Sequence, residues 1–300
     1  MAQQESRKIR FVEASLLTIA YEERGPRGGF PVVLLHGWPD DVRTWDRVAA
    51  KLNEAGFRTI APYLRGFGPT QFCEKSTMRS GQLSALGSDA IEMAQALGLD
   101  RFALVGHDWG ARAAYIAATE LSERVTRLVA IAVGYGTNSP DQQLALTQIK
   151  NYWYHWYFSL PRGIELVKNA RHELGKFMWK TWSPAWQFSE AEYAATAASF
   201  ENPDWADVTI HSYRHRWGYA DGDPRYSDLE HRLAPIPPVT VPTLVLHGEI
   251  DACNDPATSA GKEKFFTSRY VRKVLPNVGH FPQREDPERV AGEIIVWLRD

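Results

Sequence analysis

Short apolar runs alternate along the chain with longer segments in which apolar residues recur at helical spacing. The runs have the length and the branched side chains that are typical of buried strands. They cover residues 31–35, 58–61, 102–105, 127–133, 243–246 and 271–275. This alternation predicts an α/β fold with a mostly parallel sheet and crossover helices. Residues 9–12 and 16–21 predict an antiparallel hairpin at one edge of that sheet.

Two of the intervening segments have a clear apolar helix face. One such face precedes Gly98, and the other lies close to the C-terminus. Their residues are Leu86, Ala90, Met93, Ala94 and Leu97 in the first segment and Val290, Ile294, Trp297 and Leu298 in the second. Apolar residues at this spacing predict helices that pack one face against the sheet.

The alternation stops between residues 137 and 230, where aromatic residues become frequent. We therefore predict a helical cap over residues 137–230, inserted between two parts of the α/β core, residues 1–136 and 231–300. Aromatic side chains contribute large areas for packing against a core, and they also line apolar substrate tunnels. We expect both roles, filled by different residues.

Composition narrows the range of partners. With 300 residues, 44% of them hydrophobic, the chain can bury one large core. A net charge of −2 and the lack of any Lys/Arg block argue against nucleic acid or a membrane as a partner. Cys73 and Cys253 lie far apart without a histidine at metal spacing, so neither a disulfide framework nor a metal site is expected. The polar start, residues 1–6, favours a cytoplasmic protein.

The most informative motif is Gly106-His107-Asp108-Trp109-Gly110. Strand-like residues precede it and an alanine-rich helical segment follows, which is the setting of a nucleophile elbow. Aspartate occupies the position that most hydrolases give to serine. A carboxylate has a reference pKa of about 3.9 and is ionised at neutral pH, so it can attack the carbon of an epoxide or of a carbon–halogen bond. The structural alternative is a helix N-cap.

Polar residues after two further strands complete a candidate catalytic set. Ligands of open α/β sheets bind beyond the carboxyl ends of the strands. Asp251 and His280 follow the predicted strands 243–246 and 271–275. The chain order Asp108, Asp251, His280 matches the order of nucleophile, orienting acid and base in hydrolases built on such sheets. We therefore predict an Asp-His-Asp triad.

Four segments follow one another at characteristic positions. They are His36-Gly37-Trp38-Pro39, Gly106-His107-Asp108-Trp109-Gly110, Gly248-Glu249-Ile250-Asp251 and Gly279-His280-Phe281. Together they resemble the Asp-nucleophile branch of the α/β-hydrolase fold, above all the epoxide hydrolases. The resemblance implies that Asp108 forms an alkyl-enzyme ester, which water activated by His280 and Asp251 hydrolyses to a diol. Backbone N–H groups of Trp38 and Trp109 are the candidates for the oxyanion hole, and no cofactor is required.

Opening an epoxide also needs a proton donor for the departing oxygen. Epoxide hydrolases of this kind carry two cap tyrosines for the purpose, and Tyr154 and Tyr213 resemble them. The alternative for each tyrosine is an aromatic residue that only packs.

Some cap residues instead resemble the related dehalogenases. His155 and Trp156, together with Tyr213, resemble the halide pocket of fluoroacetate dehalogenases, and Arg112 resembles one of two arginines that bind the substrate carboxylate there. The second of those arginines is replaced by Trp109, and Arg112 has the alternative of a salt bridge under the cap. The candidate substrate-binding residues are His36, Arg112, His155 and Trp156. For His36, hydrogen bonding that supports its own loop is an alternative.

Three functions stay open at this point. The first is hydrolysis of a small apolar or aryl epoxide, and the second is hydrolytic dehalogenation of a haloacid or haloalkane. The third belongs to another class, a non-catalytic ligand-binding receptor of the same fold. A homodimer also stays open.

Overall fold

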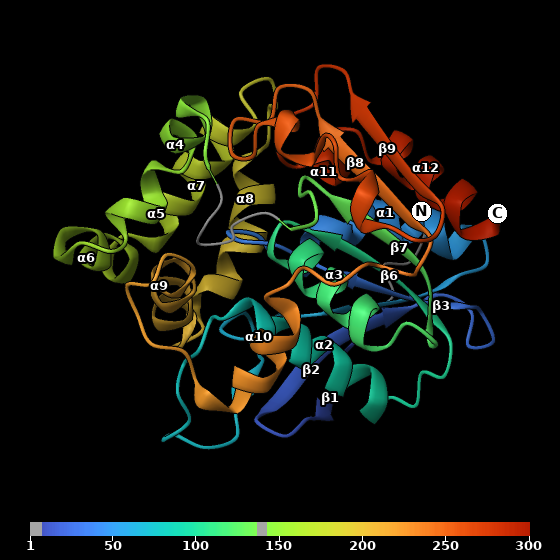
Figure 1. Ribbon diagram of the computed structural model, residues 1–300, viewed down its shortest axis with the longest axis horizontal. Helices are drawn as coiled ribbons and strands as arrows, with labels where there is room; N and C mark the ends of the chain where they lie inside the picture. Colours follow the sequence, from blue (N-terminus) through green and yellow to red (C-terminus); the bar gives the residue numbers. More distant parts are fainter. Residues whose placement is uncertain (1–7, 137–142) are drawn as a thin grey trace.

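The computed structural model describes residues 8–136 and 143–300. Its centre is one sheet in the order β1-β2-β4-β3-β6-β7-β8-β9, with β5 paired to β2 (Figure 1). The strands are β1 (Ile9–Glu13), β2 (Leu17–Arg24), β3 (Pro31–Leu35), β4 (Arg58–Pro62), β5 (Gln71–Phe72), β6 (Phe102–His107), β7 (Val125–Ile131), β8 (Thr243–Gly248) and β9 (Tyr270–Leu275). Pairing is parallel from β4 through β3, β6, β7 and β8 to β9, and β1 pairs with β2 antiparallel. The predicted mostly parallel sheet and its edge hairpin are confirmed.

Two details of the sheet differ from the prediction. Strand β7 begins and ends two residues earlier than the predicted 127–133, because Ala132 adopts a φ of 63° that turns the chain away. Strand β5 was not predicted, since two residues are too short to carry an alternating pattern.

Helices cover both faces of the sheet. Those of the core are α1 (Asp46–Glu54), α2 (Leu83–Ala96), α3 (Trp109–Glu120), α11 (Pro282–Glu285) and α12 (Pro287–Arg299). Helix α2 contacts α3, whereas α1 contacts α12. Val290, Ile294 and Trp297 are buried on one face of α12, and the predicted faces of α2 and α12 are confirmed.

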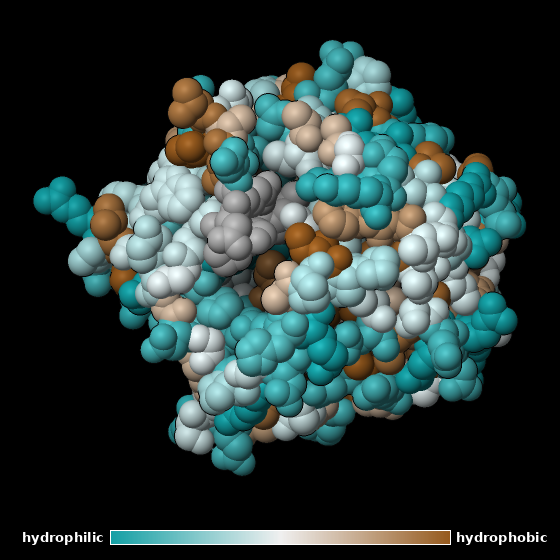
Figure 2. Space-filling view, viewed as in Figure 1, coloured by the Kyte–Doolittle hydropathy of each residue, from teal (hydrophilic) through white to brown (hydrophobic). Residues whose placement is uncertain are grey.

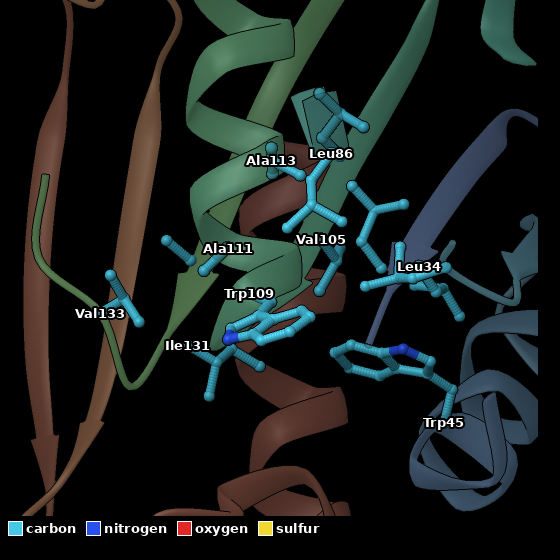
Figure 3. Close-up of a cluster of buried hydrophobic side chains, with 14 of the residues drawn as sticks. Leu34, Trp45, Leu86, Val105, Trp109, Ala111, Ala113, Ile131 and Val133 are labelled. Atoms are coloured by element: carbon cyan, nitrogen blue, oxygen red, sulfur yellow. The ribbon is translucent and has the colours of Figure 1, made fainter. Parts of the chain in front are cut away.

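The strands that support the functional loops lie deep in the core. Every residue of β6 and β8 is buried, as parallel strands covered on both faces require. Figure 3 shows Trp109, the first residue of α3, in one cluster with Val105 of β6 and Ile131 of β7. The beginning of α3 is therefore fixed by apolar packing directly next to Asp108.

The long insertion between β7 and β8 is helical. Its helices are α4 (Leu146–Asn151), α5 (Trp153–Tyr157), α6 (Pro161–Asn169), α7 (Arg171–Trp182), α8 (Glu190–Ala197), α9 (Trp205–Arg216) and α10 (Ser227–Leu233). We call residues 146–233 the cap segment. In Figure 1, α4 to α9 lie to one side of the sheet, and Figure 2 shows a hollow with hydrophobic residues on its rim where this segment meets the core.

Some of the core and cap boundaries predicted from the sequence fall on residues that the structure does not describe. The predicted start of the cap at residue 137 and the start of the core at residue 1 lie outside the described residues. At the other end, α10 continues to Leu233, and Glu230 accepts hydrogen bonds from Gln82 and Ser84 at the start of α2. The division into core and cap stays a prediction. Within the described ranges, no helix is both long and apolar enough to cross a bilayer.

Candidate active site

Asp108 lies at the sharp turn between β6 and α3. Its φ of 50° and ψ of −113° are rare for a residue with a side chain. The turn is closely packed, because a Cβ on Gly110 would overlap the carbonyl oxygen of Leu35, and one on Gly106 would overlap that of Gly110. The side chain of Asp108 caps none of the described N–H groups of α3. The geometry is that of a nucleophile elbow and not of a helix cap.

The two carboxylate oxygens of Asp108 have different surroundings. Oδ1 accepts a hydrogen bond of 3.0 Å from the backbone N–H of Trp38. Oδ2 lies 3.9 Å from Nε2 of His280. The backbone N–H of Trp109 belongs to the first turn of α3, where N–H groups lack a partner within the helix. One oxygen is thus held by a candidate oxyanion donor, and the other faces the candidate base.

Asp251 and His280 form the second contact of the triad. Nδ1 of His280 lies 2.9 Å from Oδ2 of Asp251, while Oδ1 of Asp251 accepts the N–H groups of Cys253 and Asn254 at 2.8 Å and 2.9 Å. These bonds fix the carboxylate, so that Nδ1 carries the proton and Nε2 is left as the basic nitrogen. Nε2 is buried and has no hydrogen-bond partner among the residues that the structure describes.

Burial and charge act in opposite directions on this pair. Burial disfavours the carboxylate, yet the charge of His280 and hydrogen bonds from His247 and His280 hold the pKa of Asp251 well below its usual value. Burial is the largest single influence on His280 and would lower its pKa, but the charge and hydrogen bond of Asp251, with a smaller contribution from Cys253, together raise that pKa well above its ordinary value. The structure brings together the three residues predicted from their order in the chain.

The two predicted tyrosines come from different helices of the cap segment and meet beside the elbow. Tyr154 of α5 and Tyr213 of α9 are both buried, with ring centroids 5.1 Å apart. The hydroxyl of Tyr213 accepts a hydrogen bond of 3.2 Å from Nε1 of Trp109, which leaves its own proton to donate. The Tyr154 ring stacks on Trp38 at 5.8 Å. Burial raises the pKa of each tyrosine well above its ordinary value, so both keep their protons.

The four candidate substrate-binding residues lie in different surroundings. His36 donates from Nδ1 to the carbonyl of Gly37 and accepts at Nε2 from the N–H of Leu64. Both ring nitrogens are therefore occupied by backbone, which fits support of the loop better than contact with a substrate. Trp156 is half-buried, its ring packs against Trp217, and its N–H is directed to the carbonyl of Ile149 at 3.5 Å.

The other two candidates, His155 and Arg112, lie near Tyr213 and Asp108 respectively. His155 is buried, stacks on Tyr152 at 4.1 Å, and lies 4.7 Å from the ring of Tyr213. Its pKa is lowered well below the ordinary value by burial and by the nearby charges of Arg216 and Arg112. Arg112 is buried one turn after Asp108, and its backbone N–H bonds to the carbonyl of that residue.

Two residues beside the site were missed from the sequence. Arg216 is buried on α9, with its guanidinium 4.9 Å from the ring of Tyr213 and 5.5 Å from that of Trp109. Its spacing of three residues from Tyr213 places both on one helix face, and this signal could have found it. Cys253 is a free, buried thiol whose Sγ lies 3.5 Å from the hydroxyl of Tyr154; nothing in the sequence indicates that proximity.

A separate cavity of about 230 Å³ lies against α11. It is lined by Arg43, Thr44, Asp46, Arg47, Ser189, Glu192, Ala195, Gln283 and Arg284. None of these residues belongs to the triad, so this cavity is distinct from the candidate catalytic site.

Comparison with known proteins establishes the family. The family model of the alpha/beta hydrolase fold matches residues 31–287. This chain is an α/β-hydrolase. The predicted fold is therefore confirmed, together with the resemblance to epoxide hydrolases within it.

Several relatives of this α/β-hydrolase are named epoxide hydrolases. A solved structure of a putative epoxide hydrolase from Klebsiella pneumoniae subsp. pneumoniae MGH 78578 is 41% identical, with a TM-score of 0.93 and coverage of 98% of each chain. Epoxide hydrolase 4 of Mus musculus is 25% identical over 297 residues, which cover 96% of this α/β-hydrolase and 78% of the relative. Potato (Solanum tuberosum) epoxide hydrolase I shares the fold, with a TM-score of 0.78 at 22% identity over 97% of this chain and 99% of its own.

Proposed function

We propose that this α/β-hydrolase is an epoxide hydrolase, an enzyme that adds water to an oxirane and releases a diol. The observation that carries the proposal is the division of labour at Asp108. Oδ1 is held by the N–H of Trp38 at 3.0 Å, and Oδ2 faces Nε2 of His280 at 3.9 Å. A nucleophile prepared in this way can attack carbon and then be released by a water that the histidine activates. The relatives named epoxide hydrolases support the same assignment.

In the first half-reaction, Oδ2 of Asp108 attacks one oxirane carbon. A carbon–oxygen bond forms, the bond from that carbon to the ring oxygen breaks, and the ring oxygen takes a proton from Tyr154 or Tyr213. The products are an alkyl ester on Asp108 and a tyrosinate. The 5.1 Å separation of the two rings supports a shared role in receiving the oxygen.

In the second half-reaction, Nε2 of His280 takes a proton from water, and the water oxygen attacks Cγ of Asp108. The negative charge that develops on Oδ1 is stabilised by the N–H of Trp38, with the N–H of Trp109 as the second candidate donor. The Cγ–Oδ2 bond then breaks, and the departing diol oxygen takes the proton from His280. The remaining proton on the new Asp108 carboxyl group returns to the tyrosinate, so all groups are restored.

The substrate is a small molecule in this proposal. Cytoplasmic location, the lack of nucleic acid or membrane partners, and a homodimer remain expectations from the sequence.

The test is mass spectrometry of the His280→Gln variant after incubation with styrene oxide. The ester cannot be hydrolysed without the base, so a mass increase equal to the whole epoxide is expected on the peptide that contains Asp108. His231→Gln, which changes an exposed histidine of α10, is the matched control and should show no lasting adduct. An adduct with chloroacetate accompanied by chloride release, and none with epoxides, would instead identify a dehalogenase. No adduct with any electrophile would identify a binding protein.

A further inference from the structure

We propose that Arg216 and Nε2 of His155 bind a carboxylate on the substrate, with Arg112 adding positive charge beside them. This inference rests on the proposed function and narrows its substrate class to small epoxides that carry an acid group. The prediction of an apolar or aryl substrate then applies only to the part of the substrate other than its carboxylate.

Arg216 differs in its ionic partners from three other buried arginines. Arg43, Arg65 and Arg284 are each buried and each pair with a carboxylate, on Glu22, Asp89 and Asp40 respectively. Arg216 is only 7% exposed, and among the described residues its guanidinium hydrogen-bonds to the hydroxyl of Ser212 and to no carboxylate. A buried charge without an ion-pair partner is costly. An anion from outside the chain would remove that cost.

The hydrogen-bonding groups of Arg216 are also incompletely used. Nη2 donates to the hydroxyl of Ser212 at 3.2 Å, and the guanidinium packs on the rings of Tyr213 and Trp109. Nε is buried without a partner in the described ranges. Burial and the neighbouring charge of Arg112 lower the pKa of Arg216, and Asp108 counteracts this only in part. Donors therefore remain for a ligand, and a planar guanidinium suits a carboxylate.

His155 supplies a second donor to the same place. Its Nδ1 accepts a hydrogen bond of 3.0 Å from Nε1 of Trp217. An indole N–H can only donate, so Nδ1 is the acceptor and the ring proton resides on Nε2. Nε2 is buried and, within residues 8–136 and 143–300, has no acceptor. His155 and Arg216 both pack against Tyr213, and the charge of Arg216 acts on His155 and helps to lower its pKa, which places the two residues in one neighbourhood.

The position of this donor set restricts the length of the substrate. The rings under the Arg216 guanidinium belong to Trp109, which directly follows Asp108, and to Tyr213, a proposed proton donor. A carboxylate bound there lies close to the carbon under attack. Oxirane-2-carboxylate (glycidate) is the smallest epoxide with this arrangement, and glycidamide is its uncharged isostere.

The experiment compares kcat/KM for glycidate and glycidamide. We expect the wild type to prefer glycidate at least about tenfold, since charge-assisted bonds to a buried guanidinium discriminate strongly. Arg216→Met should reduce the ratio of the two kcat/KM values at least about tenfold, and Arg216→Lys should restore part of it because the charge is kept but the fork is lost. Arg214→Met, the same change two residues earlier on α9, should leave the ratio as in the wild type. Should Arg216→Met not fold, competitive inhibition of the wild type by propionate but not by propionamide tests the same site.

The outcomes separate this inference from the proposed function. Hydrolysis of glycidamide or styrene oxide without any preference for glycidate would overturn the carboxylate site and leave the epoxide hydrolase standing. If none of the epoxides were hydrolysed, the proposed function would be overturned. Turnover of chloroacetate that depends on Arg216, with no turnover of glycidate, would support the carboxylate site but identify the enzyme as a dehalogenase.

Discussion

Replacement of Asp251 by asparagine should separate the two half-reactions. The carboxylate accepts hydrogen bonds from Nδ1 of His280 at 2.9 Å and from the N–H groups of Cys253 and Asn254, and Nε2 of His247 lies 3.3 Å from it. Asparagine has a similar shape but no charge, and only one of its two terminal atoms can accept. In the proposed mechanism, ester formation at Asp108 does not use His280 as a base, whereas ester hydrolysis requires an imidazole that is correctly oriented and becomes cationic.

The size of the effect follows from the contact distance. Two unit charges 2.9 Å apart attract each other by about 6 kcal/mol at an effective dielectric constant of about 20. Each 1.36 kcal/mol corresponds to about a factor of ten in rate. Complete loss of this attraction would therefore slow ester hydrolysis by at most about four orders of magnitude. Part of it is offset because burying a neutral amide costs less than burying a carboxylate. We expect ester hydrolysis to slow by about a thousandfold and ester formation to change by less than about tenfold.

Stopped-flow tryptophan fluorescence can follow both steps. The rings of Trp109, Trp205 and Trp182 lie within 6.4 Å of the Trp38 ring, and Trp38 contacts the nucleophile, so ester formation should change the signal. The variant should show a rapid first phase and a very slow recovery. Asp255→Asn, in the same loop, is the control, since the Asp255 carboxylate accepts the N–H of Ala257 and, among the described residues, has no ion pair with His280. If the variant recovered within tenfold of the wild-type rate, the assigned role of Asp251 would be refuted.

Three further predictions concern the scaffold. A Cβ at Gly37 would lie 2.5 Å from Cβ of Asp108, so Gly37→Ala should lower kcat/KM by about a hundredfold or more. Gly292→Ala is the control, because a Cβ at Gly292 would meet open space; this variant should leave kcat/KM unchanged and raise stability by up to about 1 kcal/mol. Arg65→Met leaves the buried Asp89 without its partner and should cost about 3–5 kcal/mol in urea unfolding; a loss below about 1 kcal/mol would contradict this reasoning. Burial and the adjacent acid raise the pKa of Asp41 from 3.8 to about 7, so the folded state retains a proton that the unfolded chain loses, and stability falls as pH rises between these values. Thermal unfolding of Asp41→Asn should lack this slope, and an equal slope in both proteins would exclude Asp41 as its source.

The sheet and the triad could be predicted because their signals are local. Each residue of the predicted triad lies within five residues of the end of a strand, and the carboxyl ends of parallel strands meet at one edge of the sheet. The elbow carries its own explanation in Gly106 and Gly110, which no larger residue could replace without overlap. Neither feature requires knowledge of how distant helices pack. The fold and the meeting of Asp108, Asp251 and His280 therefore followed from short stretches of sequence.

The surroundings of the nucleophile could not be predicted in the same way. Arg216, His155 and Cys253 approach the site from separate parts of the chain, and their contacts depend on the angles at which the cap helices pack. The spacing of Tyr213 and Arg216 shows that they share a helix face, but it does not show which side of α9 is turned towards Asp108. For His36, the residue type suggested contact with a substrate, whereas its two backbone bonds became visible only in three dimensions.

The short distance between Asp108 and His280 couples the basicity of the histidine to the state of the Asp108 carboxyl group. Before reaction, carboxylates lie 2.9 Å and 3.9 Å from the two ring nitrogens of His280. Burial alone would lower the pKa of His280, but the charge and hydrogen bond of Asp251, with a smaller contribution from Cys253, raise it. Ester formation converts Asp108 into a neutral group, so one of these charges disappears while the ring stays buried. The pKa of His280 must then fall, which favours the neutral imidazole at the stage when a base is needed. The nucleophile's own reaction thus prepares its release, and the acid limb of ester hydrolysis should lie at lower pH than the titration of His280 in the free enzyme.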